Sequence, residues 1–226
     1  METTKQLISF RYSKDFFTNR LKTRKLSKSE KDIITGNHER CPACGESQVI
    51  LLAEIDRVGF PCETVVCKYC DLVFNNTFIK SPISYYEDKF GKDRWKDPET
   101  NFLKRTQPEA YCWKRLAWVS TMLGVRFQSL NNVLEIGCGD GCNLYPYHLL
   151  GLDVKGYDYD EAFLECGRKR GMSLINGDFS EDDGTYDLII LIHSYEHMLE
   201  LDSVAQEVYR LLSDDGVIYV EVPGVK

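Results

Sequence analysis

The sequence predicts an α/β protein whose larger part is a doubly wound, mainly parallel sheet and whose smaller part is a cysteine-rich module. Three observations predict this. Strand-like and helix-like segments alternate after residue 131, a glycine-rich turn follows the first strand, and two Cys-x-x-Cys pairs precede them. Short, almost wholly apolar strands that alternate with amphipathic helices are typical of a parallel sheet covered on both faces.

Five strands are expected, in the segments VLEI, DVKGYDY, MSLING, YDLIILI and GVIYVEV. Between them we expect a helix that ends near Gly151, a second over EAFLECGRKR closed by Gly171, and a third with apolar residues from Leu201 to Leu212. The third helix repeats its apolar residues at i, i+3, i+4 and i+7, which predicts one face packed on the sheet.

A further helix is expected ahead of the sheet. Thr106-Gln-Pro-Glu109 has the spacing of a capping box, with Pro just inside a helix start. A helix from there would carry Trp113, Leu116 and Ala117 on one side and end near Gly124.

Composition and charge limit the class of protein. The chain has 226 residues, 43% of them hydrophobic, which is enough for a sizeable core. Its apolar runs reach five residues, far below the roughly 20 that span a bilayer, and the N-terminus lacks the pattern of a signal peptide. We therefore expect a soluble, cytoplasmic protein whose nine cysteines serve as thiols and metal ligands.

The net charge of −7 is unevenly distributed along the chain. Residues 1–31 hold nine Lys or Arg against three acidic residues, and the remainder holds 19 against 32. Such an acidic body makes nucleic acid an unlikely partner, because binding to it depends on neutralising phosphates. The basic segment is interpreted as a solvated, partly helical tail, with contact to an anionic partner as the alternative.

Four segments are expected: a basic segment at 1–35, a cysteine module at 36–80, a helical connector or cap at 81–125, and the α/β region at 126–226.

The glycine-rich turn, Glu135-Ile-Gly-Cys-Gly-Asp-Gly141, follows the first strand directly. Its glycines at 137, 139 and 141 permit a sharp turn and the close approach of a ligand to bare backbone. A dinucleotide site would have a third glycine where this chain has Cys142, and Glu135 precedes the first glycine. This pattern favours a ligand that has no pyrophosphate and carries a cationic group.

Two further acidic residues end the next strands. Asp158 closes the second strand, 21 residues after Gly137, where a carboxylate can accept both hydrogens of a ribose diol. Asp178 closes the third, where it could accept from an exocyclic amino group while Phe179 covers the ring face. Each Asp alone could be a turn residue, but with the glycine-rich turn they favour a nucleoside-type cofactor.

The motifs VLEIGCGDG, GYD, GDF and YDLIILIHSYEH…LLSDDGVIYVEVP resemble, in content and order, those of class I S-adenosylmethionine-dependent methyltransferases over roughly residues 108–226. The resemblance implies a Rossmann-like fold in which the glycine loop wraps the methionine end, Asp158 holds the ribose and Asp178 meets the adenine. The expected cofactor-binding residues are Glu135, Gly137, Cys138, Gly139, Gly141, Asp158, Tyr159, Asp178, Phe179 and His193.

The cysteine module predicts a metal site. Cys41-Pro-Ala-Cys44 and Cys67-Lys-Tyr-Cys70 are two knuckles with 22 residues between them. Four thiolates in two such pairs suit a closed, structural, tetrahedral Zn²⁺ site, that is, a zinc ribbon. Gly45 follows the first pair and turns easily, and Asp71 follows the second, where it tolerates a left-handed backbone less well than Gly but better than most residues.

A zinc ribbon ahead of this pattern, leading to Tyr85-Tyr86, resembles bacterial methyltransferases of sugar and polysaccharide biosynthesis, and more weakly nucleotide-deoxysugar C-methyltransferases. The resemblance implies catalytic residues largely after the fifth strand, whereas this chain ends at Lys226, so we expect a shortened C-terminal part. Val217–Val222 would then form an outer strand with an apolar edge. We therefore expect the chain either to be a fragment or to cover this edge by self-association.

The candidate catalytic residues are His193, Tyr195, Glu196 and His197, which follow the fourth strand. The alternative is that they cap the next helix and line the cofactor pocket without acid–base work. The order HSYEH differs from the HExxH of zinc proteases. Tyr85, Tyr86 and Tyr111 could close over the pocket or fill the core.

Three functions remain in competition. The first is methyl transfer to a small molecule, a sugar or nucleotide-sugar above all. The second is RNA methylation with the zinc ribbon and basic segment as the grip, and the third is a cofactor-binding fragment without activity.

Overall fold

A computed structural model describes residues 34–55, 61–79, 97–198 and 200–223, and the chain divides into two compact units, residues 1–81 and 82–226. The predicted division into four segments stays a prediction. Most of the basic segment, as well as Tyr85 and Tyr86, lies outside the described residues.

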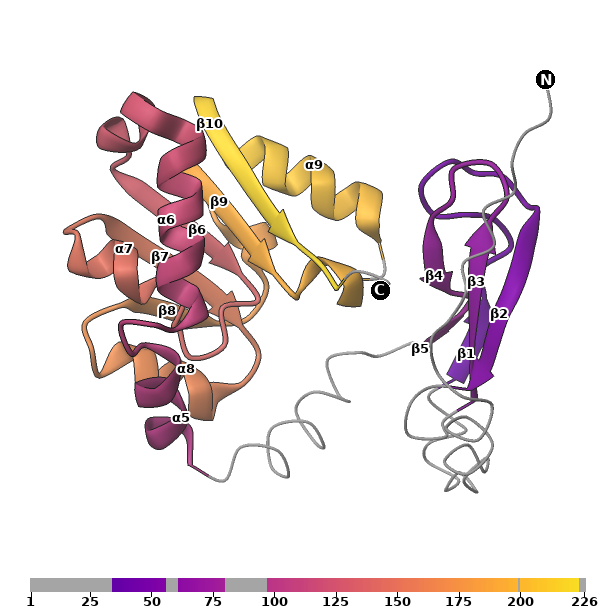
Figure 1. The fold of residues 1–226 in the computed structure, drawn as a ribbon, viewed down its shortest axis with the longest axis horizontal. Helices are drawn as coiled ribbons and strands as arrows, with labels where there is room; N and C mark the ends of the chain where they lie inside the picture. The colour runs from indigo at the N-terminus through magenta and orange to yellow at the C-terminus, as the bar shows by residue number, and fades with distance from the viewer. Residues whose placement is uncertain (1–33, 56–60, 80–96, 199, 224–226) are drawn as a thin grey trace. The chain divides into compact units, whose positions relative to one another are not determined.

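The N-terminal unit contains two small antiparallel sheets (Figure 1). Their strands are β1 (Ile34–Asn37), β2 (Val49–Ile55), β3 (Pro61–Cys67), β4 (Val73–Asn75) and β5 (Thr77–Ile79). β1 pairs with β5, and the other three lie in the order β2-β3-β4. The two cysteine knuckles lie in the turns after β1 and after β3.

The second unit is built on a five-stranded sheet in the order β10-β9-β6-β7-β8, in which every neighbouring pair is parallel. The strands are β6 (Asn132–Ile136), β7 (Asp153–Asp158), β8 (Ser173–Asn176), β9 (Tyr186–Ile192) and β10 (Leu212–Glu221). These are the five strands expected from the sequence, so the predicted α/β fold class is confirmed. From β6 the chain first adds β7 and β8 on one side and then β9 and β10 on the other. The strand order therefore reverses between β6 and β9.

Helices cover both faces of this sheet, as expected of a doubly wound fold (Figure 1). One core holds Val133 and Ile190 of the sheet with residues of α5 (Pro98–Arg105), α6 (Tyr111–Leu123), α7 (Tyr145–Leu149) and α8 (Glu161–Arg168). The other core holds Leu134 and Ile189 with residues of α9 (Leu201–Leu211). Of the helices in the described ranges, none has the length and apolar character needed to cross a membrane.

The helix ahead of the sheet differs from the prediction at its start. Thr106 does not cap α6. Its backbone N–H and its hydroxyl both donate to the Phe102 carbonyl, at 3.0 and 2.9 Å, and so end α5, a helix that the sequence analysis missed. A turn follows, α6 begins at Tyr111, and it ends at Gly124, as expected. Ala117 is exposed, because the buried side of α6 runs through Cys112 and Val119.

Candidate active site and metal centre

The glycine loop after β6 adopts the left-handed backbone that its glycines permit. Gly137, Gly139 and Gly141 have φ of +77°, +53° and +75°. A Cβ at Gly137 would lie 2.5 Å from the Cβ of Ser194, whereas a Cβ at Gly139 would meet open space. Gly137 therefore allows another loop to approach, while Gly139 leaves bare backbone beside a free volume.

The segment after β9 is held against this loop. The Ser194 hydroxyl, nearly buried, donates to the Ile136 carbonyl at 2.7 Å. β6 and β9 are neighbours in the sheet, so their carboxyl ends bring the glycine loop and the HSYEH segment together. His193, the first residue of that segment, therefore stands beside the expected cofactor site.

Glu135 is the most unusual acidic residue of the site. It is fully buried, its Oε1 accepts from Asn143 Nδ2 at 2.8 Å, and its Oε2 has no hydrogen-bond partner among the described residues. Burial raises the pKa of Glu135 to about 8. A buried, unpartnered carboxyl oxygen is expensive unless a ligand supplies a donor, and a cationic donor would serve best.

Asp158 at the end of β7 is already engaged by backbone N–H groups. Its Oδ2 accepts from Gly139 at 2.8 Å, and its Oδ1 accepts from Tyr159 and Asp160 at 2.8 and 3.0 Å. Burial raises the pKa of Asp158 despite these bonds. A carboxylate offers about four acceptor positions, so roughly one remains for a ligand while the glycine loop stays anchored.

Asp178, after β8, lies beside Tyr159. The Tyr159 hydroxyl is 3.1 Å from Asp178 Oδ2, and Asp178 Oδ1 accepts from the Ser180 N–H at 2.8 Å. Phe179 is 8% exposed and packs in the core with Tyr157 and Tyr186. The stacking of Phe179 on the ring of a nucleoside-type cofactor stays a prediction. Only a small part of the Phe179 side chain is open to solvent. Cys138, also expected at the cofactor, is buried.

His193 has a positive φ of +52° and a side chain that is 47% exposed. Its Nε2 lies 3.1 Å from Glu221 Oε1 and its Nδ1 lies 3.8 Å from Glu196 Oε1. His197 Nε2 is also 3.8 Å from Glu196, and Tyr195, half-buried, donates from its hydroxyl to the Leu201 carbonyl. Three of the four candidate catalytic residues thus share a polar cluster, and Tyr195 binds the next helix.

Glu221, at the end of β10, belongs to this cluster although the sequence analysis did not single it out. Arg115 of α6 donates to both of its carboxylate oxygens, at 2.7 and 2.5 Å, and the Tyr219 hydroxyl lies 2.8 Å away. Arg115 is the main cause that lowers the pKa of Glu221 to about 2. Glu221 could have been found by the rule that selected Asp158 and Asp178, since it too ends a parallel strand.

Arg115 continues the network toward the glycine loop. Its guanidinium donates to Asn143 Oδ1 at 3.2 Å, and Asn143 in turn donates to Glu135. A chain of polar contacts therefore joins His193 to Glu135 through the side chains of Glu221, Arg115 and Asn143. Tyr111, in the first turn of α6, is 72% exposed, so the suggestion that it fills the core is wrong.

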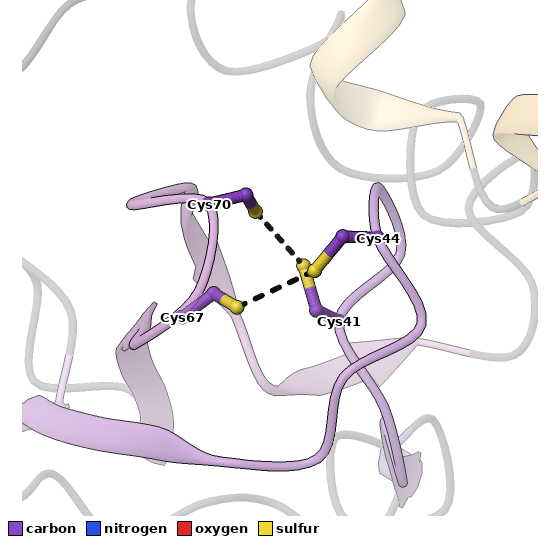
Figure 2. Close-up of side chains that lie close together, drawn as sticks. All are labelled: Cys41, Cys44, Cys67 and Cys70. Carbon is purple, nitrogen blue, oxygen red and sulfur yellow. Dashed lines mark hydrogen bonds between the residues drawn. The ribbon is translucent and has the colours of Figure 1, made fainter.

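The four predicted metal ligands converge in the N-terminal unit (Figure 2). Their sulfurs all lie within 4.8 Å of one another, with 3.6 Å between Cys41 and Cys70 and 3.5 Å between Cys44 and Cys67. Four sulfurs placed tetrahedrally at about 2.3 Å from a zinc ion lie about 3.8 Å apart. The arrangement therefore fits a tetrahedral ion.

The two knuckles repeat one backbone pattern. Gly45 and Asp71 have φ of +74° and +60°, and their N–H groups donate to the carbonyls of Cys41 and Cys67. Both positions thus have a left-handed backbone, which Asp tolerates better than most residues. The backbone N–H groups of Cys70 and Tyr69 lower the pKa of Cys67 to about 7. Although the Glu46 N–H lowers the pKa of Cys44, burial and the neighbouring cysteine sulfurs raise it to about 12.

Comparison with known proteins agrees with this fold. A family model described as a methyltransferase domain matches residues 103–226, more than half of the chain. The chain therefore belongs to the methyltransferase domain family.

Its curated relatives include a ubiquinone biosynthesis O-methyltransferase of Bordetella avium, 29% identical over 148 residues, which are 58% of each chain. A probable S-adenosylmethionine-dependent methyltransferase of Mycolicibacterium smegmatis is 30% identical over 97 residues, 41% of this chain and 38% of that protein. The chain thus spans little more than half the length of the Bordetella avium relative and a smaller part of the Mycolicibacterium one.

Among solved structures, an amino pentose methyltransferase from Micromonospora echinaspora has a TM-score of 0.47 and 20% identity, covering 55% of this chain and 56% of that one.

Proposed function

We propose that the chain transfers a methyl group from S-adenosylmethionine to a small molecule. Membership of the methyltransferase domain family supports this. The observation that carries it is the buried, unpartnered Oε2 of Glu135 behind a glycine loop with open space at Gly139. A site of that kind fits a cationic ligand that approaches backbone closely.

The chain's own residues would divide the work of holding this cofactor. Glu135 would meet the cationic end and Gly139 would offer bare backbone. Asp158 would accept from the ribose with its remaining acceptor position, and Asp178 with Tyr159 would meet the adenine. When bound, the cofactor supplies an electrophilic methyl group on a sulfonium, so much of the remaining task is to position the acceptor.

For the acceptor we propose a sugar or nucleotide-sugar, in keeping with the zinc module ahead of the methyltransferase domain. The alternative is a hydroxyl group on another class of small molecule, because several relatives are named as ubiquinone biosynthesis O-methyltransferases. The cysteine cluster would hold one structural zinc ion, because four protein ligands leave no open position for substrate.

The decisive experiment follows labelled methyl transfer from S-adenosylmethionine into three separate pools: nucleotide-sugars, phenolic quinone precursors and RNA. Transfer into nucleotide-sugars supports the proposal in full. Transfer into the phenols supports methyl transfer but contradicts the proposed sugar acceptor. Salt-sensitive transfer into RNA would overturn the small-molecule proposal, and cofactor binding without transfer to any pool would identify a binding module. Asp158→Ala serves as the variant expected to lose transfer, with Asp153→Ala, at the opposite end of β7, as its matched control.

A further inference from the structure

The polar cluster between β9, β10 and α6 contains a histidine whose two ring nitrogens face different carboxylates. Nε2 of His193 lies 3.1 Å from Glu221 Oε1, whereas Nδ1 lies 3.8 Å from Glu196 Oε1. The nearer carboxylate favours a proton on Nε2, because a negative charge attracts the N–H of a neutral imidazole most strongly at short range. Nδ1 is then left with its lone pair, beyond hydrogen-bond distance of Glu196.

Glu221 is itself held in place. Arg115 donates to both carboxylate oxygens and Tyr219 to one, and Arg115 is the main cause that holds the pKa of Glu221 at about 2. The carboxylate is therefore charged throughout the physiological range, and its position is set by two elements, α6 and β10. The charged or titratable groups around His193 are Glu221, Glu196, His197, Arg115 and Tyr219.

The backbone of His193 supplies an independent observation. Its φ of +52° is rare for a residue with a side chain, and the surroundings maintain it. The His193 N–H donates to the Glu221 carbonyl at 2.8 Å, and the next residue, Ser194, is tied to Ile136 beneath the glycine loop. The side chain nevertheless remains 47% exposed, so a small molecule can reach it.

We propose that Glu221 is a positioning residue that keeps the proton of His193 on Nε2, so that Nδ1 acts as the base for a hydroxyl acceptor. This rests on the proposed function. The acceptor O–H bond breaks and its proton passes to Nδ1. The oxygen keeps the electron pair and uses it to bond the methyl carbon, as the carbon–sulfur bond breaks toward sulfur. The imidazolium that results is stabilised by Glu221 and later returns its proton to water.

The first test needs neither cofactor nor acceptor. In full-length protein labelled with ¹⁵N-histidine, the nitrogen shifts of the neutral His193 ring report which nitrogen carries the proton, and His193→Gln assigns the signal among four histidines. We expect protonation on Nε2 in the wild type and a rise in the Nδ1-protonated form in Glu221→Gln. Glu196→Gln is the matched control and should not move the proton to Nδ1. An unchanged tautomer in Glu221→Gln, with the fold intact by circular dichroism, would overturn the proposal.

The second test addresses the base, with nucleotide-sugars as the acceptor probe. At saturating S-adenosylmethionine, where a lost cofactor contact does not limit the rate, His193→Gln should lower kcat by about 100- to 10,000-fold, the usual contribution of a general base. Glu221→Gln should lower kcat by a smaller factor, and Glu221→Asp should recover part of the loss. A normal kcat in His193→Gln would show that His193 is not the general base, whereas the proposed methyl transfer would still hold. Failure of the wild type to bind S-adenosylmethionine would instead reject the proposed function, and the tautomer test would still stand.

Discussion

The carboxylates at the carboxyl edge of the sheet differ in their partners, and these partners decide what each can offer a ligand. Glu135 is buried with one oxygen unpartnered, whereas Asp158 accepts three backbone N–H groups. Asp178 is exposed and paired with Tyr159, and Glu221 is bound by Arg115. Four acids that look alike in the sequence thus have four different environments.

Asp158 should contribute both to the ribose contact and to the shape of the glycine loop. Replacing it by Ala should weaken S-adenosylmethionine binding by on the order of 2–3 kcal/mol, roughly 30- to 150-fold, because a charge-assisted contact and a loop anchor are lost together. Titration calorimetry measures this, with Asp153→Ala as the control at the opposite end of β7. Equal affinity in wild type and Asp158→Ala would show that the ribose lies elsewhere.

Glu135 should make the stability of the ligand-free protein depend on pH. Its pKa rises from an ordinary 4.5 to about 8 on folding, so the folded state holds the proton more tightly than the unfolded state. The stabilisation is full below about pH 4.5 and is lost as pH rises toward 8, since stability falls wherever the folded state binds more protons.

Urea denaturation at several pH values between 5 and 8 measures this decline. Glu135→Gln, which cannot ionise, should show a shallower decline than the wild type, and Glu165→Gln, at an exposed position of α8, should match the wild type. A decline as steep in Glu135→Gln as in the wild type would assign the pH dependence to other groups.

At the scale of elements, β10 is the outer strand expected from the sequence. Among the described residues it pairs only with β9, and it has a register shift between Leu212 and Val217. Val217 and Tyr219 pack against the core under α6, where Tyr219 lies against the Trp118 ring. Ile218 and Val220, on the opposite side, are 39% and 46% exposed.

An exposed apolar edge strand is a template for pairing with another chain, so the 226-residue chain should self-associate. Val220→Lys should shift it toward the monomer, because a charge on an edge strand opposes pairing. Tyr209→Lys, at a more exposed apolar position on α9, should have no such effect. Light scattering over a concentration series decides, and a wild type that stays monomeric throughout would contradict the prediction.

At the scale of the whole molecule, the chain consists of two units with separate sources of stability. The second unit has a hydrophobic core on each face of its sheet. In the N-terminal unit the fully buried residues of the described ranges are Cys41, Val65 and Cys67, so two of its three buried side chains are metal-ligand candidates. Metal binding is therefore expected to supply much of its folding free energy.

We predict one zinc ion per chain. Chelation should increase hydrogen exchange in residues 34–79 while S-adenosylmethionine affinity stays mostly unchanged, because the proposed cofactor-binding residues belong to the other unit. Cys44→Ser should lose the metal, and Cys62→Ser, in the same unit but outside the cluster, should retain it. Freshly purified, unchelated protein with less than half an equivalent of zinc would contradict this prediction.

The sequence by itself determined the features that depend on local order. Apolar runs and helical spacing predicted the five strands and α9, since side-chain periodicity follows backbone geometry. Closely spaced pairs predicted the cysteine cluster, and positive φ at Gly45 and Asp71 followed from turn chemistry. The glycine loop was predicted for the same reason.

Only the tertiary structure decided which distant side chains meet. The sequence predicted a helix start at Thr106, but in the structure Thr106 donates to the Phe102 carbonyl and ends α5. A threonine can serve either purpose, and the local sequence does not decide between them. The strand order brought Glu221 to His193, and the packing of α6 brought Arg115 to both Glu221 and Asn143. No local pattern encodes these contacts, since they join residues up to 106 positions apart and arise from how sheet and helix pack.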